Sequence, residues 1–470
     1  MINNKIRNNP VELLAPAGNL EKLKTALIYG ADAVYFGLPG FSLRARASQF
    51  EKKEIIEGAK LCRKKGRKFY LALNIYAHNI HIDNLMEQLN FIKKIKPDGI
   101  ILSDPGILRV IKAELPKIDI HISTQANVTN KEAAKFWRDQ GAKRIILARE
   151  VSLAEIKEIK KAVPDIKLEC FVHGAMCMAY SGRCILSKWM LNRSANLGDC
   201  AQPCRWKYHG NSEFGKFRRQ NLRDSLHLPD KLNSVLCSIF PRTLLKLVIP
   251  KYNVNKKDNE IKTMNIVDDK NRFEIKLEED QNGTYLFNSN DICLIEHLKE
   301  LQEAGIDSFK IEGRTKSVYY VAMVVRAYKK AMEGLQGAKP QVLKVLIKEQ
   351  KKELENLSNR GYWKGFMFQT EPPHLFDEAA KEAKLMFIGI SLEDFENLDS
   401  AIRKVFVHNS FKKGDSIEAV TPSEIYKTKI IEINDDSAEN LESAHGGQDK
   451  IFSIKFDKKI KGFFILRKKI

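Results

Sequence analysis

The sequence lacks the features of a membrane-spanning or exported protein. It contains no run of eighteen apolar residues, so we expect no helix that crosses a bilayer and no membrane partner. The first ten residues, MINNKIRNNP, are polar and include no apolar stretch, so we also expect no secretory signal. These absences predict a cytoplasmic protein, in which disulfides are rare and clustered cysteines act as ligands or catalysts.

Several catalytic and nucleotide-binding motifs are absent as well. No HExxH, GxSxG or GxxxxGKS/T pattern occurs, which argues against a zinc peptidase, a nucleophile-elbow hydrolase and a P-loop enzyme. The turn after the first apolar run, in LLAPAGNLEK, has no GxGxxG pattern, which disfavours a dinucleotide-binding sheet. The C-x3-C-x2-C pattern of radical S-adenosylmethionine enzymes fails, because Lys207 stands where the third cysteine would be.

What is present describes an ordinary globular chain with a strong positive charge. The 470 residues are 43% hydrophobic and 29% charged, enough for a large core in two or three domains. Lysine and arginine number 79 against 59 acidic residues, a net charge of +20. Such a charge favours a polyanionic partner such as nucleic acid, and a lysine-decorated solvated surface is the alternative explanation.

A repeated pattern of amphipathic helix, glycine and short apolar run predicts the fold. Gly30, Gly66, Gly141 and Gly305 stand where a left-handed residue would end each helix. Eight apolar runs suit strands buried on both faces: 11–15, 33–37, 68–74, 99–103, 119–123, 144–148, 168–172 and 309–312. We therefore predict an α/β fold, a (β/α)8 TIM-like barrel, with a doubly wound open sheet as the alternative.

The spacing of these runs predicts three regions. We expect the barrel over residues 10–335, with an insertion at about 174–290 that carries clustered cysteines and a basic segment. A helical linker is expected over 336–384. From 385 to 470 the pattern changes to short strands separated by turns, which predicts a small C-terminal β-barrel.

Polar residues close most of the predicted barrel strands. In a parallel barrel these strand ends meet at the C-terminal mouth, where active sites are built. A single polar strand end is often only structural, but several that converge on one rim indicate a site. The candidates for positioning a substrate or transferring a proton are Gln125, Glu150, His173 and Glu312.

Four cysteines fall in one short window and are the strongest chemical signal. Cys177, Cys184, Cys200 and Cys204 follow the spacing C-x6-C-x15-C-x3-C. Structural zinc sites favour paired C-x2–4-C knuckles, and all-cysteine ligation at irregular spacing suits a 4Fe-4S cluster better. Zinc and no metal stay open as alternatives. A catalytic pair of Cys177 with His173 is disfavoured, because a thiolate committed to a metal cannot attack a carbonyl.

Aromatic residues alternate with basic ones after the cysteines. Stacking rings beside phosphate-binding cations are what single-stranded RNA recognition needs, and aromatics packed onto the barrel are the alternative. The RNA-binding candidates are Arg205, Trp206, Lys207, Arg218 and Arg219. The remaining cysteines, Cys62, Cys170, Cys237 and Cys293, lie in apolar or helical contexts, so we expect them to be small buried hydrophobic residues.

Over about residues 10 to 370 the chain resembles the peptidase U32 (collagenase-like) family. The motifs that carry the resemblance are PVELLAPAGNLE, YGADAVYFGLPGFSLRAR, FVHGAMCMAYSGRCILS, STQANV, SFKIEGRTKSVYY and NRGYWKGF. They are similar to those of the family's tRNA-hydroxylating branch, with a weaker fit over the C-terminal strands. The segment from about 209 to 270 departs from that pattern.

The resemblance implies an RNA-modifying enzyme. That branch forms 5-hydroxyuridine at the wobble position of tRNA, depends on prephenate and carries a 4Fe-4S cluster on four cysteines, which match Cys177, Cys184, Cys200 and Cys204. Because prephenate is a dicarboxylate, the anion-binding candidates are Arg44, Arg46, Arg149, Lys310 and Arg314. A U32-type peptidase and a non-catalytic RNA-binding factor with a structural metal are the rival functions.

Overall fold

The computed structural model describes residues 10–42, 50–177, 179–191, 200, 204, 262–267, 274–280, 283–285, 290–368, 383–392, 399–435, 437–447 and 451–470. The chain forms two compact units, one of residues 1–201, 290–372 and 381–470 and one of residues 202–289 and 373–380. Several sequence-based candidates lie outside the described residues: Arg44, Arg46, Arg205, Trp206, Lys207, Arg218, Arg219 and Cys237.

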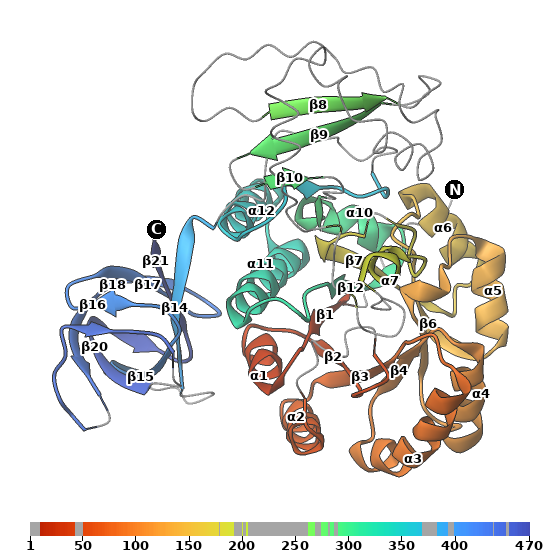
Figure 1. Ribbon diagram of the computed structural model, residues 1–470, viewed down its shortest axis with the longest axis horizontal. Helices are drawn as coiled ribbons and strands as arrows, with labels where there is room; N and C mark the ends of the chain where they lie inside the picture. The colour runs from red at the N-terminus through yellow and green to blue at the C-terminus, as the bar shows by residue number, and fades with distance from the viewer. Residues whose placement is uncertain are drawn as a thin grey trace, which may run out of the picture. The chain divides into compact units, whose positions relative to one another are not determined.

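A closed parallel barrel forms the centre of the first unit (Figure 1). Its strands pair in the order β1 (Glu12–Pro16), β2 (Ala33–Gly37), β3 (Lys68–Leu73), β4 (Gly99–Leu102), β5 (Ile120–Ile122), β6 (Ala142–Ile146), β7 (Lys167–Ala175) and β12 (Ile306–Ile311). Strand β12 pairs with both β7 and β1, which closes the ring. The eight strands coincide with the eight apolar runs, so the TIM-like barrel is confirmed and an open doubly wound sheet is excluded.

Helices surround the barrel and connect its strands (Figure 1). They are α1 (Leu20–Ile28), α2 (Lys52–Lys64), α3 (Asn79–Ile95), α4 (Pro105–Glu114), α5 (Lys131–Asp139), α6 (Leu153–Ala162), α10 (Leu298–Glu303) and α11 (Val318–Gly337). Side chains of Asn19, Asp104, Ser152 and Ser317 cap four of them by accepting bonds from free backbone N–H groups. Gly30, Gly66, Gly141 and Gly305 all have positive φ, as the sequence predicted.

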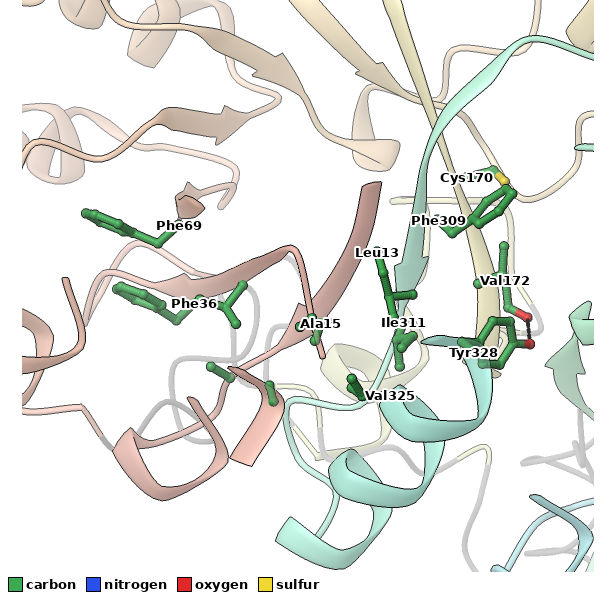
Figure 2. Packing of buried hydrophobic residues seen from close by; sticks show 14 of the residues in the cluster. Leu13, Ala15, Phe36, Phe69, Cys170, Val172, Phe309, Ile311, Val325 and Tyr328 are labelled. Carbon is green, nitrogen blue, oxygen red and sulfur yellow. Dashed lines mark hydrogen bonds between the residues drawn. The ribbon is translucent and has the colours of Figure 1, made fainter. Parts of the chain in front are cut away.

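Alternate residues of each strand point to opposite sides of the barrel wall. Leu13, Phe36 and Phe309 belong to the outer core, which includes Val325 of α11 (Figure 2). The neighbouring positions form a separate interior cluster: Leu14, Ala33, Tyr35, Tyr70, Ala72, Ile101, Ile146 and Phe171. This division assigns any other strand residue to the interior or the exterior by its parity along the strand.

The structure adds elements to the simple eightfold pattern. After the insertion, β11 (Asp291–Cys293) runs antiparallel to the extended end of β7, and β13 (Tyr362–Trp363) pairs with β11. Short helices α7 (Leu186–Leu191), η2 (Thr124–Ala126) and η5 (Ile295–His297) fill connections, and α12 (Pro340–Glu355) packs on α11. In the second unit, β8 (Lys262–Val267), β9 (Glu274–Asp280) and β10 (Gly283–Tyr285) form an antiparallel sheet.

The C-terminal strands close into a six-stranded antiparallel barrel, as the sequence predicted. Its strands are β14 (Leu385–Ser391), β15 (Asp399–Val407), β20 (Ile451–Lys461), β18 (Ile425–Asn434), β17 (Ser416–Val420) and β21 (Ile465–Lys469). A two-stranded ribbon, β16 (Phe411–Lys412) with β19 (Ser443–Ala444), accompanies them. None of the helices in the described ranges is long and apolar enough to span a bilayer.

Side chains of α1 and α11 hold this C-terminal barrel through backbone oxygens. The Tyr29 hydroxyl donates to the Val420 carbonyl at 2.6 Å, and Arg326 Nε donates to the Thr421 carbonyl at 2.8 Å. Arg467 reaches from β21 to Glu353 of α12 at 2.7 Å and is almost fully buried. These contacts fix the C-terminal barrel against the helical side of the first barrel.

Candidate active site

A buried network of charges lies in the barrel interior, on residues of β1, β6, β7 and β12. Arg144 bonds the Glu12 carboxylate at 2.6 Å and the Glu169 carboxylate at 2.7 Å. Lys310 Nζ donates to the other oxygen of Glu169 at 2.7 Å, and the Tyr70 hydroxyl donates to Glu12 at 2.7 Å. Two carboxylates therefore face two cations, which balances the charge in a space with little water.

Burial and charge shift the pKa of these groups in different directions. Burial acts to raise the pKa of Glu12, but the adjacent Arg144 outweighs it and holds the carboxyl below its usual range. Burial lowers the pKa of Lys310, and the positive charges of Arg314 and Arg144 act in the same direction, against Glu169. The Lys310 amine is therefore easier to deprotonate than an ordinary lysine.

Most residues of this network were not among the site residues predicted from the sequence. Glu12, Arg144 and Glu169 stand inside apolar runs, and Lys310 was assigned only to anion binding. The alternation of side chains along a strand could have revealed them. Glu12, Arg144 and Glu169 each lie two residues before an inward-facing apolar residue of the same strand, so they must face inward too. A charge at such a position is inside the barrel and needs a partner there.

Two aromatic rings flank the Lys310 amine of this network and also contact cations at the mouth. Lys310 Nζ lies 4.4 Å from the ring centre of Tyr35 and 5.5 Å from that of Phe171. The Arg149 guanidinium lies 4.0 Å from the Phe171 ring, and that of Arg314 lies 5.5 Å from the Tyr35 ring. Arg149 and Arg314 follow the carboxyl ends of β6 and β12, so the mouth carries positive charge next to these rings.

The two arginines at the mouth make different contacts on the protein. Arg149 lies 3.6 Å from Glu312, beyond the length of a good hydrogen bond, and its Nε is buried without a partner among the described residues. Arg314 donates to the Ser42 hydroxyl. A Cβ atom at Gly37 would collide with Ser42 and stand 3.3 Å from the Arg314 guanidinium, so only glycine leaves room for this contact.

Amide and hydroxyl groups line the mouth at β3, β4 and β5. Gln125 Oε1 accepts from the amide of Asn74 and, at 3.0 Å, from the Ser123 hydroxyl. Gln125 Nε2 and the Ser103 hydroxyl are buried, and neither has a hydrogen-bond partner in the part of the chain that the structure describes. Buried polar atoms normally have partners, so these two groups are available to a ligand in the mouth.

His173 lies apart from these groups. A register shift between β7 and β12 precedes its pairing with Ile311, and its ring packs against Tyr320, Tyr328 and Tyr362 at 5.4 to 5.9 Å. Burial lowers its pKa to about 3, so the imidazole is neutral at physiological pH. The structure brings Lys310, Arg149, Glu312 and Arg314 together but encloses His173 in tyrosines.

The first cysteines are carried by a loop that folds across the mouth. The Tyr76 hydroxyl, after β3, donates to the Gly182 carbonyl at 2.6 Å, and the Ser181 amide donates to Glu150 Oε1 at 2.6 Å. Gly182 has a φ of +78°, and a Cβ there would lie 2.7 Å from the Gln125 carbonyl. These contacts tie the loop between Cys177 and Cys184 to the ends of β3, β5 and β6.

Three of the four clustered thiols share one neighbourhood. Burial raises the pKa of Cys184, and electrostatic interaction with Cys177 and Cys200 acts in the same direction. All four clustered cysteines are half-buried, and Cys204 belongs to the second unit. Within the described ranges, no three His, Cys, Asp or Glu side chains are close enough to hold a single metal ion. The thiols thus interact without forming a mononuclear site.

The other cysteines behave as predicted where the structure describes them. Cys62, Cys170 and Cys293 are buried, and burial raises the pKa of Cys62 to about 12 and that of Cys293 to about 11. Such thiols stay protonated and inert at neutral pH. The clustered cysteines are therefore distinguished from the rest by exposure as well as by spacing.

Comparisons with known proteins identify the family of the chain. The family models "Peptidase family U32" and "Peptidase family U32 C-terminal domain" match residues 18–375 and 384–467. "tRNA hydroxylation protein P" of Haemophilus influenzae is 35% identical over 94% of this chain and 92% of its own length. "23S rRNA 5-hydroxycytidine C2501 synthase" of Escherichia coli is 30% identical over 70% of this chain and 40% of its own. "Collagenase" of Porphyromonas gingivalis is 28% identical over 84% and 82%. With both family models matched in order along nearly its whole length, the chain belongs to peptidase family U32.

Proposed function

We propose that this protein is a tRNA-modifying enzyme that forms 5-hydroxyuridine at the wobble position, in a reaction that depends on prephenate and uses a 4Fe-4S cluster. The observation that carries the proposal is the cysteine loop, which Tyr76 and Glu150 hold across the barrel mouth. Relatives named for tRNA hydroxylation and for a 5-hydroxycytidine synthase support a base-hydroxylating activity.

The cysteines Cys177, Cys184, Cys200 and Cys204 are the proposed ligands of the cluster, which would supply electron transfer beside the mouth. Electrostatic interaction among three of these thiols fits such a set. Thiols must lose their protons to bind iron, and half-buried thiols are more accessible to an incoming metal than the buried Cys62, Cys170 and Cys293. Among the described residues, no three His, Cys, Asp or Glu side chains gather around one point as a single zinc ion requires.

The mouth residues suggest how the two substrates would be oriented. Arg149 and Arg314 would bind carboxylates of prephenate through forked hydrogen bonds, and their position beside the Phe171 and Tyr35 rings at the mouth supports this role. Gln125 Nε2 and the Ser103 hydroxyl, which have no hydrogen-bond partner among the described residues, would bond the oxygen atoms of a flipped uracil. Glu312 and Glu150 are the proposed proton acceptors at the rim, and the basic segment from Arg205 to Arg219 is the proposed contact to tRNA phosphates.

The test is complementation of a strain that lacks the gene, with tRNA nucleosides measured by mass spectrometry. We expect the wild-type gene to restore 5-hydroxyuridine derivatives and Cys184→Ala not to restore them. Cys62→Ala is the matched control, because Cys62 is buried in α2 and should be dispensable for the reaction. The protein purified without oxygen should show iron and the charge-transfer absorption of a cluster, which Cys184→Ala should lose. Full rescue by Cys184→Ala would contradict the proposal.

A peptidase is the second candidate, because a relative is named a collagenase. A cysteine peptidase would need His173 as the base for Cys177. The three tyrosine rings around His173, and its low pKa, disfavour that role. Digestion of gelatin that survives chelation and is lost in Cys177→Ser would favour the peptidase. Unchanged tRNA nucleosides in the deletion strain would instead indicate a non-catalytic RNA-binding factor.

A further inference from the structure

We propose that Lys310 forms a covalent imine with the carbonyl group of an α-oxo acid that enters the barrel mouth. The role of such an adduct in catalysis rests on the proposed function, whereas formation of the adduct does not.

Lys310 differs from Lys160, which is also buried among the described residues of the first unit. Lys160 packs outside the barrel, where its Nζ donates to Asp307 at 2.8 Å and to the Ile166 carbonyl at 2.6 Å. Lys310 Nζ points into the barrel, where Glu169 at 2.7 Å is its hydrogen-bond partner and two aromatic rings cover its other sides. An amine held by a single carboxylate can become a nucleophile by passing one proton to it.

Burial and two nearby cations make the Lys310 ammonium easier to deprotonate than an exposed lysine. Burial lowers the pKa of Lys310, and the cations Arg314 and Arg144 lower it further. A lysine that is desolvated and near another cation is the usual form of an imine-forming residue. Glu169 opposes this shift, but it also supplies the group that would take up the proton.

The cations at the mouth select the substrate class. Arg149 lies against Phe171 and Arg314 against Tyr35, the same two rings that flank the Lys310 amine. The Arg149 side chain is nine-tenths buried, and its Nε has no partner within the described ranges. A buried guanidinium with an unused donor is a site for a carboxylate. In an α-oxo acid the reactive carbonyl is bonded directly to that carboxylate, so binding at the arginines would direct the carbonyl toward Lys310.

The reaction balances without an oxidant or reductant. The Lys310 ammonium passes one proton to Glu169, and the free lone pair forms a C–N bond to the carbonyl carbon. The carbonyl oxygen becomes the hydroxyl of a carbinolamine as a proton moves to it from nitrogen. Glu169 then returns its proton to that hydroxyl, which leaves as water while the C=N bond forms. The net change is an ammonium and a ketone converted to a protonated imine and water, with Glu169 again a carboxylate, and hydrolysis reverses it.

The test is chemical trapping in the full-length protein purified without oxygen. Pyruvate is the probe, and cyanoborohydride reduces any imine to a stable secondary amine. We expect one reduced pyruvate adduct per chain by intact mass, located on the peptide that contains Lys310. Lys310→Arg keeps the positive charge opposite Glu169 and should lose the adduct, whereas the matched variant Lys160→Arg should keep it.

A second comparison tests the assigned substrate class. Arg149→Gln should lower the trapping of pyruvate but leave the trapping of acetone, which has no carboxylate, at its wild-type level. Absence of an adduct on the Lys310 peptide of the wild-type protein would overturn the proposal, whether or not Lys310→Arg folds. An adduct in a protein that leaves tRNA unmodified would refute the proposed function alone, and modified tRNA without an adduct would refute the imine alone.

Discussion

Replacement of Arg144 by methionine tests the charge balance inside the barrel. Methionine is similar in length but removes the cation between Glu12 and Glu169, so Lys310 is left to face two carboxylates. Loss of one partner from a buried ion pair typically costs about 3–5 kcal/mol. The Glu12 side chain retains 14% exposure, and water can offset part of its loss, so we expect the lower end, about 3 kcal/mol.

The assay is the midpoint of thermal unfolding, measured on all variants at one heating rate. At roughly 2 °C per kcal/mol for a domain of this size, Arg144→Met should lower the midpoint by about 6 °C. Adding Glu12→Gln restores equal numbers of charges, so the double variant should recover part of that loss. Arg138→Met is the control, because Arg138 pairs with Asp139 on the surface and should change the midpoint by roughly 1 °C or less.

The reasoning would be refuted by either of two results. A midpoint for Arg144→Met equal to that of Arg138→Met would mean that the barrel interior solvates the two carboxylates without Arg144. A double variant less stable than Arg144→Met would mean that Glu12 does not depend on the cation. In that case its hydrogen bonds to Tyr70 and Ser308 would be the dominant interactions.

Two further predictions follow from single residues. Gly182→Ala should reduce both the cluster content and the tRNA hydroxylation, because the added Cβ would collide with the Gln125 carbonyl. Gly66→Ala is the control and should retain both, because Gly66 also has a positive φ but has open space around it. Iron analysis and nucleoside mass spectrometry measure the two properties. The pKa of His173 is about 3 in the folded protein, whereas that of an unfolded histidine is about 6.5. Between these values the unfolded chain binds a proton that the folded protein does not. The free energy of unfolding should therefore fall by about 1.4 kcal/mol for each unit that the pH drops through this window. His173→Gln should show a shallower decrease of the unfolding midpoint below pH 6.5, and an unchanged slope would contradict the low pKa.

The barrel could be predicted from the sequence because its signal is local. Each strand is a short apolar run, and each helix ends at a glycine such as Gly30 or Gly141 whose positive φ the structure confirms. The C-terminal barrel was equally visible, from alternating strands separated by turns. In both cases the pattern that specifies an element lies within the element itself.

Contacts between distant residues could not be predicted in the same way. Glu12, Arg144 and Glu169 meet only because the barrel closes, and no spacing along the chain reveals it. His173 appeared to end a strand at the mouth, but a register shift and three tyrosines from later segments enclose it. The antiparallel strand β11 likewise depends on the path of the chain through the insertion. Such features depend on tertiary packing, which local patterns do not specify.

The contacts between the two barrels bear on whether the C-terminal barrel can be exchanged between related proteins. Tyr29, Arg326 and Lys330 recognise main-chain oxygens of Val420, Thr421 and Ser423 rather than their side chains. A turn of the same shape would satisfy these donors whatever its amino acids. A chimera bearing the equivalent module of a distant relative should therefore dock through the same three donors, provided that its last strand also carries a cation to pair with Glu353, as Arg467 does here.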